Sequence, residues 1–131
     1  MRYEDIISAR VCPYCGRTPV LADSAEAYNG RSFGPIWLCR PCRAFVGCHK
    51  GTTTPKGRLA DAALREAKKA AHHAFDPLWQ EGLMRRTDAY ASLSKALGIP
   101  REYTHIGMFN IAQCQETIRV CTELKQTLTK R

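Results

Sequence analysis

The sequence predicts an α+β fold, in which a small N-terminal module of short antiparallel strands precedes a C-terminal region of three to four helices. Two Cys-x-x-Cys pairs occur early in the chain, with β-prone segments between and after them. From Leu59 onward, apolar residues recur at intervals of three and four, which is the period of an amphipathic helix. The expected parts are a module at 1–50, a basic loop at 51–58, and a helical region at 59–131 packed on the module.

The two cysteine pairs predict a metal site. Each pair brings two thiolates within reach of one ion, and together they supply four ligands: Cys12, Cys15, Cys39 and Cys42. Zn²⁺ is the favoured ion because it is redox-inert and takes four thiolates tetrahedrally. The alternative is a disulfide framework, which requires an oxidising compartment. The first residues show no secretion signal, and the seven cysteines are odd in number, so we expect reduced cytoplasm and one structural Zn²⁺.

The segments around the cysteines predict a zinc ribbon. Thr18–Leu21 has the composition of a short extended segment. Ala27–Tyr28 and Phe33–Leu38 are expected to pair around a turn at Asn29–Gly30. Ala44–Gly47, just after the second cysteine pair, is apolar and β-prone, which disfavours a helix at this position.

Aromatic residues in this module have two alternative roles. Aromatic faces beside basic residues can form platforms on which the bases of single strands stack. The role we expect instead is to cover the metal site and form the small core. The four residues are Tyr28, Phe33, Trp37 and Phe45.

The charge of the chain predicts an anionic partner. The formal net charge is +8, and four thiolates around one divalent cation lower it to about +6. Residues 40–69 hold eight basic residues against Asp61 and Glu66. They form either a solvated face or a surface that contacts phosphates, and the segment at 51–58 is likewise either a linker or a phosphate-contacting loop. The basic residues are Arg40, Arg43, Lys50, Lys56, Arg58, Arg65, Lys68 and Lys69.

The first helix is expected from Leu59 to about Phe75, because alanines and leucines recur there at helical spacing. We expect it to break before Pro77 and restart there, with Asp76 as the N-cap. The rings of His72 and the histidine after it point in different directions on a helix, so we expect no second metal site at this pair.

Two later helices are expected beyond this point. One is capped by Thr87 or Asp88 and ends before Gly98. The last begins near Asn110, with Gln113 at the capping-box position. Its expected apolar seam, in which both cysteines are buried thiols, is Ile111, Cys114, Ile118, Cys121, Leu124 and Leu128.

Several distinct motifs follow one another along nearly the whole chain. They are Cys12-x-x-Cys15, Trp37-Leu38-Cys39-x-x-Cys42, Val46-Gly47-x-His49, Leu64-Arg65, Ala71-His72, Phe75-Asp76-Pro77-Leu78-Trp79, Tyr90, Leu97-Gly98 and His105-Ile106-Gly107-x-Phe109. This combination resembles the zinc-finger-containing domain of unknown function found in phage and bacterial proteins. The resemblance implies zinc binding and a phage or prophage setting, hence the cytoplasm of a bacterial host, and it names no reaction.

Three functions are compatible with these features. The leading hypothesis is a non-enzymatic protein that binds DNA or RNA through the basic residues. An alternative is a regulator that binds a host protein. A third is a metal-dependent nuclease in which four residues converge: His49, His72, Asp76 and His105. Otherwise His49 hydrogen-bonds a ligating sulfur, contacts a phosphate, or is an ordinary polar residue at the end of a strand. No catalytic residue is assigned, no membrane span is expected, and the oligomeric state is left open.

Overall fold

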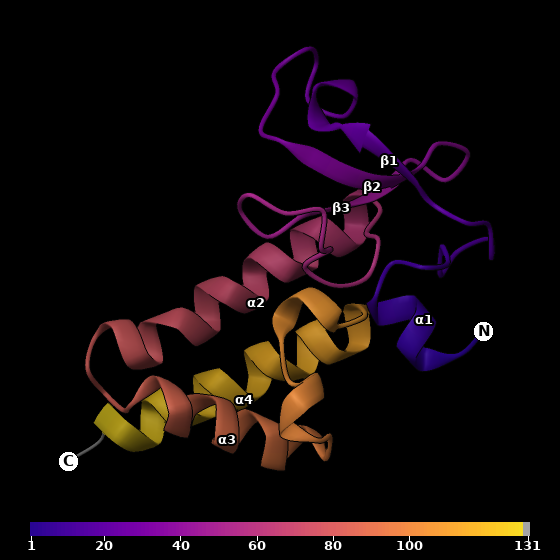
Figure 1. Cartoon of the computed structure of the whole chain (residues 1–131). Coiled ribbons are helices and arrows are strands. Elements are labelled where there is room, and N and C mark those ends of the chain that lie inside the picture. The colour runs from indigo at the N-terminus through magenta and orange to yellow at the C-terminus, as the bar shows by residue number, and fades with distance from the viewer. Residues whose placement is uncertain (130–131) are drawn as a thin grey trace. The chain divides into compact units, whose positions relative to one another are not determined.

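The computed structural model describes residues 1–129 of the chain. It divides into two compact units, Met1–Ala62 and a second unit that begins at Ala63. The first unit holds the short helix α1 (Tyr3–Ile7) and a three-stranded sheet, while the second holds the longer helices (Figure 1). Strands therefore precede helices, and the α+β prediction is confirmed.

The sheet is antiparallel, with β2 (Pro35–Cys39) between β1 (Val20–Asp23) and β3 (Ala44–Gly47). Cys39 pairs with Ala44, so the second cysteine pair lies in the hairpin turn between β2 and β3. Arg43 turns the chain with a φ of 51°, in the left-handed region. The prediction of a strand rather than a helix after the second cysteine pair is confirmed.

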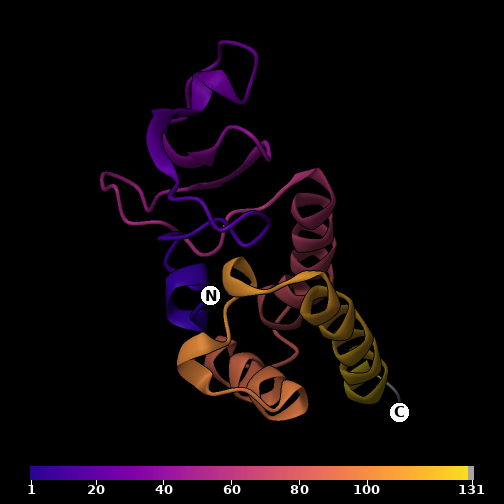
Figure 2. The ribbon, with the colours of Figure 1, turned by 90° about the vertical axis from the view of Figure 1, so that its right-hand side faces the viewer.

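The loop between β1 and β2 differs from the expected hairpin. β2 pairs with β1, whereas Ala27–Tyr28 lies outside the strands, after the short helix η1 (Ser24–Glu26). The cause is Ser24, whose buried hydroxyl accepts a hydrogen bond from the Phe33 amide at 2.6 Å, while its own amide donates to Gly34 at 2.9 Å. These bonds close a wide loop that extends away from the sheet (Figures 1 and 2).

The segment expected as a basic loop or linker is joined to the sheet. Phe45 and Ala60 exchange two backbone hydrogen bonds of 3.0 and 2.9 Å, and Lys56 donates its amide to Gly47. Residues 51–60 therefore return along β3, and the first unit reaches Ala62 rather than residue 50. Leu59, expected to open a helix, is instead fully buried in the core of this unit.

Strand alternation gives the sheet two different faces. One face carries a cluster that includes two of the cysteines, with Trp37 and Cys42 packed against it. The members of this cluster are Ala9, Cys12, Cys39, Ala44, Val46 and Leu59. The opposite face carries Ile36, Leu38 and Phe45.

Helix α2 (Ala62–Gln80) continues through Pro77, so the predicted break before this residue is wrong. A proline in a helix lacks the amide that would bond to the carbonyl four residues earlier, at a cost of about 3 kcal/mol. Phe75 and Leu78 on either side of Pro77 are fully buried, and burial of both favours the helical path. Asp76 is consequently in mid-helix and is not an N-cap.

Local capping chemistry accounts for the C-terminal end of the first later helix but not for its start. α3 (Arg86–Leu97) ends at Gly98, whose φ is 69° and whose amide donates to the carbonyls of Ser94 and Lys95, as expected. Its N-cap is Arg85, not Thr87 or Asp88.

Helix α4 (Ile111–Thr129) begins with the predicted capping box. The Gln113 amide donates to Asn110 Oδ1 at 2.8 Å, and the Asn110 amide donates to Gln113 Oε1 at 3.0 Å. These reciprocal bonds satisfy two backbone amides at the start of the helix.

The buried face of α4 is rotated from the expected seam. Cys114 and Cys121 are buried, as predicted, but Thr117 and Val120 accompany them, while Ile111 and Leu128 are each 39% exposed. Thr117 is tolerated because its hydroxyl donates to the Gln113 carbonyl at 2.8 Å. Burial raises the pKa of the Cys121 thiol to about 12, which keeps it protonated and unreactive.

Replacing Asn110 tests the capping box. Asn110→Ala is expected to destabilise the helical unit by about 1 kcal/mol, because the Gln113 amide loses its acceptor. Urea unfolding followed by circular dichroism measures the loss, and faster hydrogen exchange at the Gln113 amide localises it. Gln115→Ala, at an exposed position of the same helix, is the control and should change neither quantity. Equal exchange in both variants would contradict the assigned cap.

Candidate metal centre

The four predicted ligands lie together. The sulfur atoms of Cys12, Cys15, Cys39 and Cys42 are all within 4.8 Å of one another, and those of Cys15 and Cys39 are 3.5 Å apart. A tetrahedral site with Zn–S bonds of about 2.3 Å has S···S edges of about 3.8 Å. The arrangement therefore fits one ion. Among residues 1–129, this is the one group of three or more His, Cys, Asp or Glu positioned to hold a metal.

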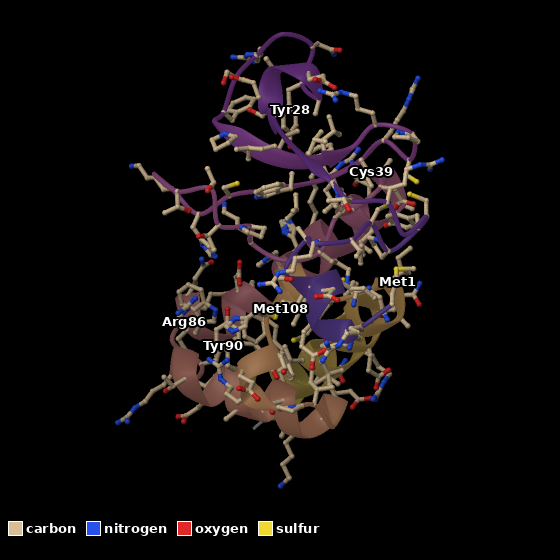
Figure 3. All side chains as sticks on the ribbon, turned by 45° about the vertical axis from the view of Figure 1, so that its right-hand side comes forward. Met1, Tyr28, Cys39, Arg86, Tyr90 and Met108 are labelled. Atoms are coloured by element: carbon tan, nitrogen blue, oxygen red, sulfur yellow. The ribbon has the colours of Figure 1, made fainter. Side chains whose placement is uncertain are left out.

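Two tight turns position the sulfur atoms. In the first, the Gly16 amide donates to the Cys12 carbonyl and the Cys12 amide donates to the Arg17 carbonyl, both at 2.8 Å. Gly16 has a φ of 79°, which a residue with a Cβ rarely adopts. The second turn joins β2 to β3, and Figure 3 marks Cys39 where β2 ends.

The site is shielded on one side and open on the other. Cys12 and Cys39 are buried within the apolar cluster, Cys42 is half-buried, and Cys15 is exposed. Trp37 packs against this cluster, as expected, and its indole nitrogen donates to the Thr53 carbonyl at 2.7 Å. Trp37 thus covers the metal cluster and Phe45 is buried in a small core on the opposite face of the sheet, as expected, whereas Tyr28 and Phe33 are 43% and 70% exposed.

Ionisation of one thiol in this cluster opposes ionisation of its neighbours. The Arg17 amide donates to the Cys15 sulfur and lowers the pKa of Cys15 to about 6. The neighbouring Cys15 sulfur raises the pKa of Cys42 to about 12, and burial raises the pKa of Cys12. A divalent cation removes this conflict by stabilising every thiolate, and four sulfur donors are the ligand set of structural Zn²⁺. Such a set leaves no open coordination position for a substrate.

Cys48 and His49 do not belong to the metal cluster. Cys48 forms a β-bridge with Pro55, and burial raises the pKa of its thiol. The backbone amide of His49 donates to the Thr54 carbonyl at 2.9 Å, and its exposed side chain lines a pocket with Phe45. The four-cysteine site is therefore complete without either residue.

The remaining residues proposed for a nuclease site have different surroundings. His72 Nδ1 lies 3.3 Å from Asp76 Oδ2, one turn along α2. His105 packs against the Tyr90 ring, with centroids 5.9 Å apart. Burial, and then the charges of Arg101 and Arg86, lower the pKa of His105, so its neutral form is favoured.

The basic residues of the first unit differ in availability. Arg40 makes two hydrogen bonds to the Glu26 carboxylate, of 2.6 and 2.9 Å. Arg58 is buried, with 8% of its surface exposed. Arg43, Lys50 and Lys56 are exposed.

The second unit carries the other three basic residues on α2. Arg65 and Lys68 are half-buried. Lys69 is exposed and lies 3.3 Å from a Glu66 carboxylate oxygen. The predicted basic residues are thus divided between two compact units.

One cationic cluster was not anticipated from the sequence. The guanidinium groups of Arg86 and Arg101 lie 5.1 and 4.3 Å from the centroid of the Tyr90 ring, and Arg86 also lies 5.2 Å from the Trp79 ring. Figure 3 shows Arg86 and Tyr90 side by side. The one local signal was the four-residue spacing of Arg86 and Tyr90 on α3, which places both on one helix face.

Comparison with known families agrees with the metal site. A family model described as a zinc-finger-containing domain matches residues 8–124, which include all four cysteines. No curated protein and no solved structure matches the chain.

Substitution of one ligand tests the metal centre. Cys39→Ser is expected to lower the zinc content from one ion per chain to none and to unfold residues 12–48, because metal binding and folding of such a site are coupled. Atomic absorption measures the zinc, and residue-resolved hydrogen exchange measures the folding. Cys48→Ser is the matched control and should retain one zinc. A Cys39→Ser protein with unchanged zinc content and circular dichroism would refute the ligand assignment.

Acid should release the metal. Binding displaces protons from thiols, and the pKa values of Cys12 and Cys42 are raised, so protons compete more strongly for these sulfurs as the pH falls. The zinc affinity is expected to fall by at least about tenfold for each pH unit below neutrality, which corresponds to one or more displaced protons. Competition with a chelating dye at several pH values measures this slope. A pH-independent affinity would show that thiols are not the ligands.

Proposed function

Since the chain belongs to the zinc-finger-containing domain family, whose model matches most of its length, we propose that it is a zinc-stabilised, non-enzymatic protein that binds DNA or RNA. One observation carries the proposal. Between Ala27 and Ala60 the sequence has six basic residues and no acidic residue. A phosphate backbone approaching this stretch meets no carboxylate from it.

The metal fixes the position of these charges. The acid-free stretch contains β2 and β3, and it includes two of the four ligands, Cys39 and Cys42. Zinc therefore holds the scaffold that carries the cations, and its four sulfur ligands give it a structural role.

Side-chain surroundings refine the set of phosphate contacts. Lys50 and Lys56 are exposed and line the same pocket, and Arg43 is exposed at the turn beside the metal. The proposed surface leaves out Arg58, which is buried, and gives Arg40 a smaller role because Glu26 already neutralises it. The first unit thus contributes Arg43, Lys50 and Lys56.

A second group of cations lies on α2. Lys68 and Lys69 follow Arg65 by three and four residues, which places all three on one side of the helix. The ion pair between Lys69 and Glu66 is highly exposed and therefore weak, so a phosphate can replace the carboxylate. The phage or prophage origin implied by the family resemblance stays a prediction.

The salt dependence of binding tests this function. The logarithm of the association constant should fall linearly with the logarithm of salt concentration, by about 0.9 per phosphate contact on a duplex and about 0.7 on a single strand. Lys50→Glu/Lys56→Glu is expected to weaken binding and to reduce this slope by about two contacts. Lys95→Glu/Lys125→Glu changes the net charge equally at other exposed positions and is the control. Fluorescence anisotropy with labelled DNA and RNA measures both quantities.

The helix contribution is measured separately with Lys68→Glu/Lys69→Glu. A reduced salt slope would assign phosphate contacts to α2, and an unchanged slope would confine them to the first unit. Absence of binding to every DNA and RNA at about 0.15 M salt would contradict the proposal. The basic residues would then form a solvated face or a docking surface for a protein.

A further inference from the structure

A pocket lies on the face of the sheet opposite the metal cluster. Its volume is about 370 Å³, within the range of about 300–1,000 Å³ that is typical of ligand pockets. It combines aromatic rings with basic side chains. The residues used in the argument are Tyr28, Phe33, Phe45, His49, Lys50 and Lys56.

Three aromatic rings of the pocket are in contact with one another in series, and their exposure increases from the core to the surface. Tyr28 contacts Phe45 and Phe33 edge to face, with centroid distances of 5.5 and 5.2 Å and interplanar angles of 81° and 83°. Phe45 is buried, Tyr28 is 43% exposed and Phe33 is 70% exposed. Figure 3 marks Tyr28, the middle member of this series. The outermost ring therefore presents apolar surface to solvent, which a ligand can cover.

The exposure of Phe33 arises from an ordered backbone. Its amide donates to the buried Ser24 hydroxyl at 2.6 Å, and the Ser24 amide donates to the adjacent Gly34 carbonyl at 2.9 Å. The chain then turns at Gly34 with a φ of 105°. These contacts fix the loop while the phenyl ring remains outside the core, so the ring is pre-positioned for a partner.

Two lysines supply charge complementarity. Lys50 and Lys56 are exposed and belong to a loop that is held at both ends, because His49 donates its amide to Thr54 and Lys56 donates its amide to Gly47. Of the described residues that line the pocket, none is acidic. An aromatic surface beside two cations suits a ligand with a flat apolar ring and a neighbouring anion.

We propose that this pocket, the Phe33 pocket, binds an unpaired base of a single-stranded nucleic acid. The base stacks on Phe33, and Lys50 and Lys56 neutralise the adjoining phosphates. A duplex cannot use the ring in this way because its bases are already stacked on one another. The inference rests on the proposed nucleic-acid binding and adds a preference for single strands.

Phe33 variants test the stacking contact. Phe33→Ala is expected to weaken binding of labelled oligo(dT) and oligo(U) by about 5- to 150-fold, the range for loss of one stacked base. Phe33→Leu retains apolar volume without a ring and should also weaken binding, whereas Phe33→Trp should restore it. The salt slope should stay unchanged in all three variants, because no phosphate contact is removed.

Controls separate stacking from general effects. Leu21→Ala removes an equally accessible apolar side chain, 47% exposed, from the same unit and should leave affinity unchanged. A hairpin duplex should bind the wild type and Phe33→Ala equally. One zinc per chain in every variant checks the fold. Stacking is also read directly, as quenching of a 2-aminopurine base that is lost in Phe33→Ala.

Three other results would contradict the Phe33 pocket, the preference for single strands, or nucleic-acid binding itself. If Phe33→Ala binds single strands as the wild type does, while Lys50→Glu/Lys56→Glu still weakens binding, the Phe33 pocket is wrong and nucleic-acid binding stands. If Phe33→Ala weakens duplex and single strands equally, the single-strand preference is wrong. If the wild type binds no nucleic acid, both proposals fail. If the wild type does bind single strands, comparison of its affinities for oligo(dT) and oligo(U) shows whether it prefers DNA or RNA.

Discussion

Mutual repulsion among four thiolates whose sulfurs lie within 4.8 Å of one another is the constraint on which the first unit depends. Zinc removes the repulsion and thereby ties the segment around Cys12 to the hairpin turn that carries Cys39 and Cys42. The apolar cluster then closes over the site, with Leu59 and Ala9 arriving from opposite ends of the unit. A unit of 62 residues has a small core, and a metal is one of the ways in which small domains gain stability.

Placing the metal on one face of the sheet determines what the other face can do. Trp37, Cys39, Ala44 and Val46 are committed to the metal side, whereas the alternating residues Ile36, Leu38 and Phe45 form a separate small cluster. The wide loop after η1 covers part of this second cluster with Tyr28, but it leaves Phe33 at the surface. The rigid zinc side therefore supports a second face that is free to carry a pocket.

Features that depend on a short sequence motif can be predicted from the sequence. Features that depend on tertiary packing or on contacts across a loop cannot. The Gly98 cap and the Asn110–Gln113 capping box depend on residues close together in the chain, and each Cys-x-x-Cys pair is a local motif even though Cys15 and Cys39 are 24 residues apart. The continuation of helix α2 through Pro77 could not be predicted, because it depends on burial of Phe75 and Leu78 in the helical unit. The widened loop was missed because Ser24, an ordinary turn residue by composition, bonds across nine positions to Phe33.

Distribution of charge matters more here than its total. Residues 1–62 contain nine basic and five acidic side chains, a net charge of +4, and the zinc–thiolate centre lowers this to about +2. A net charge this small does not by itself steer a polyanion. All five acidic residues of this unit lie outside Ala27–Ala60, so the basic residues of that stretch share a region without carboxylates of its own. Screening limits the reach of exposed charges to about 8 Å at physiological salt, so a phosphate at the proposed Phe33 pocket would respond to the charges near it rather than to the net charge of the unit.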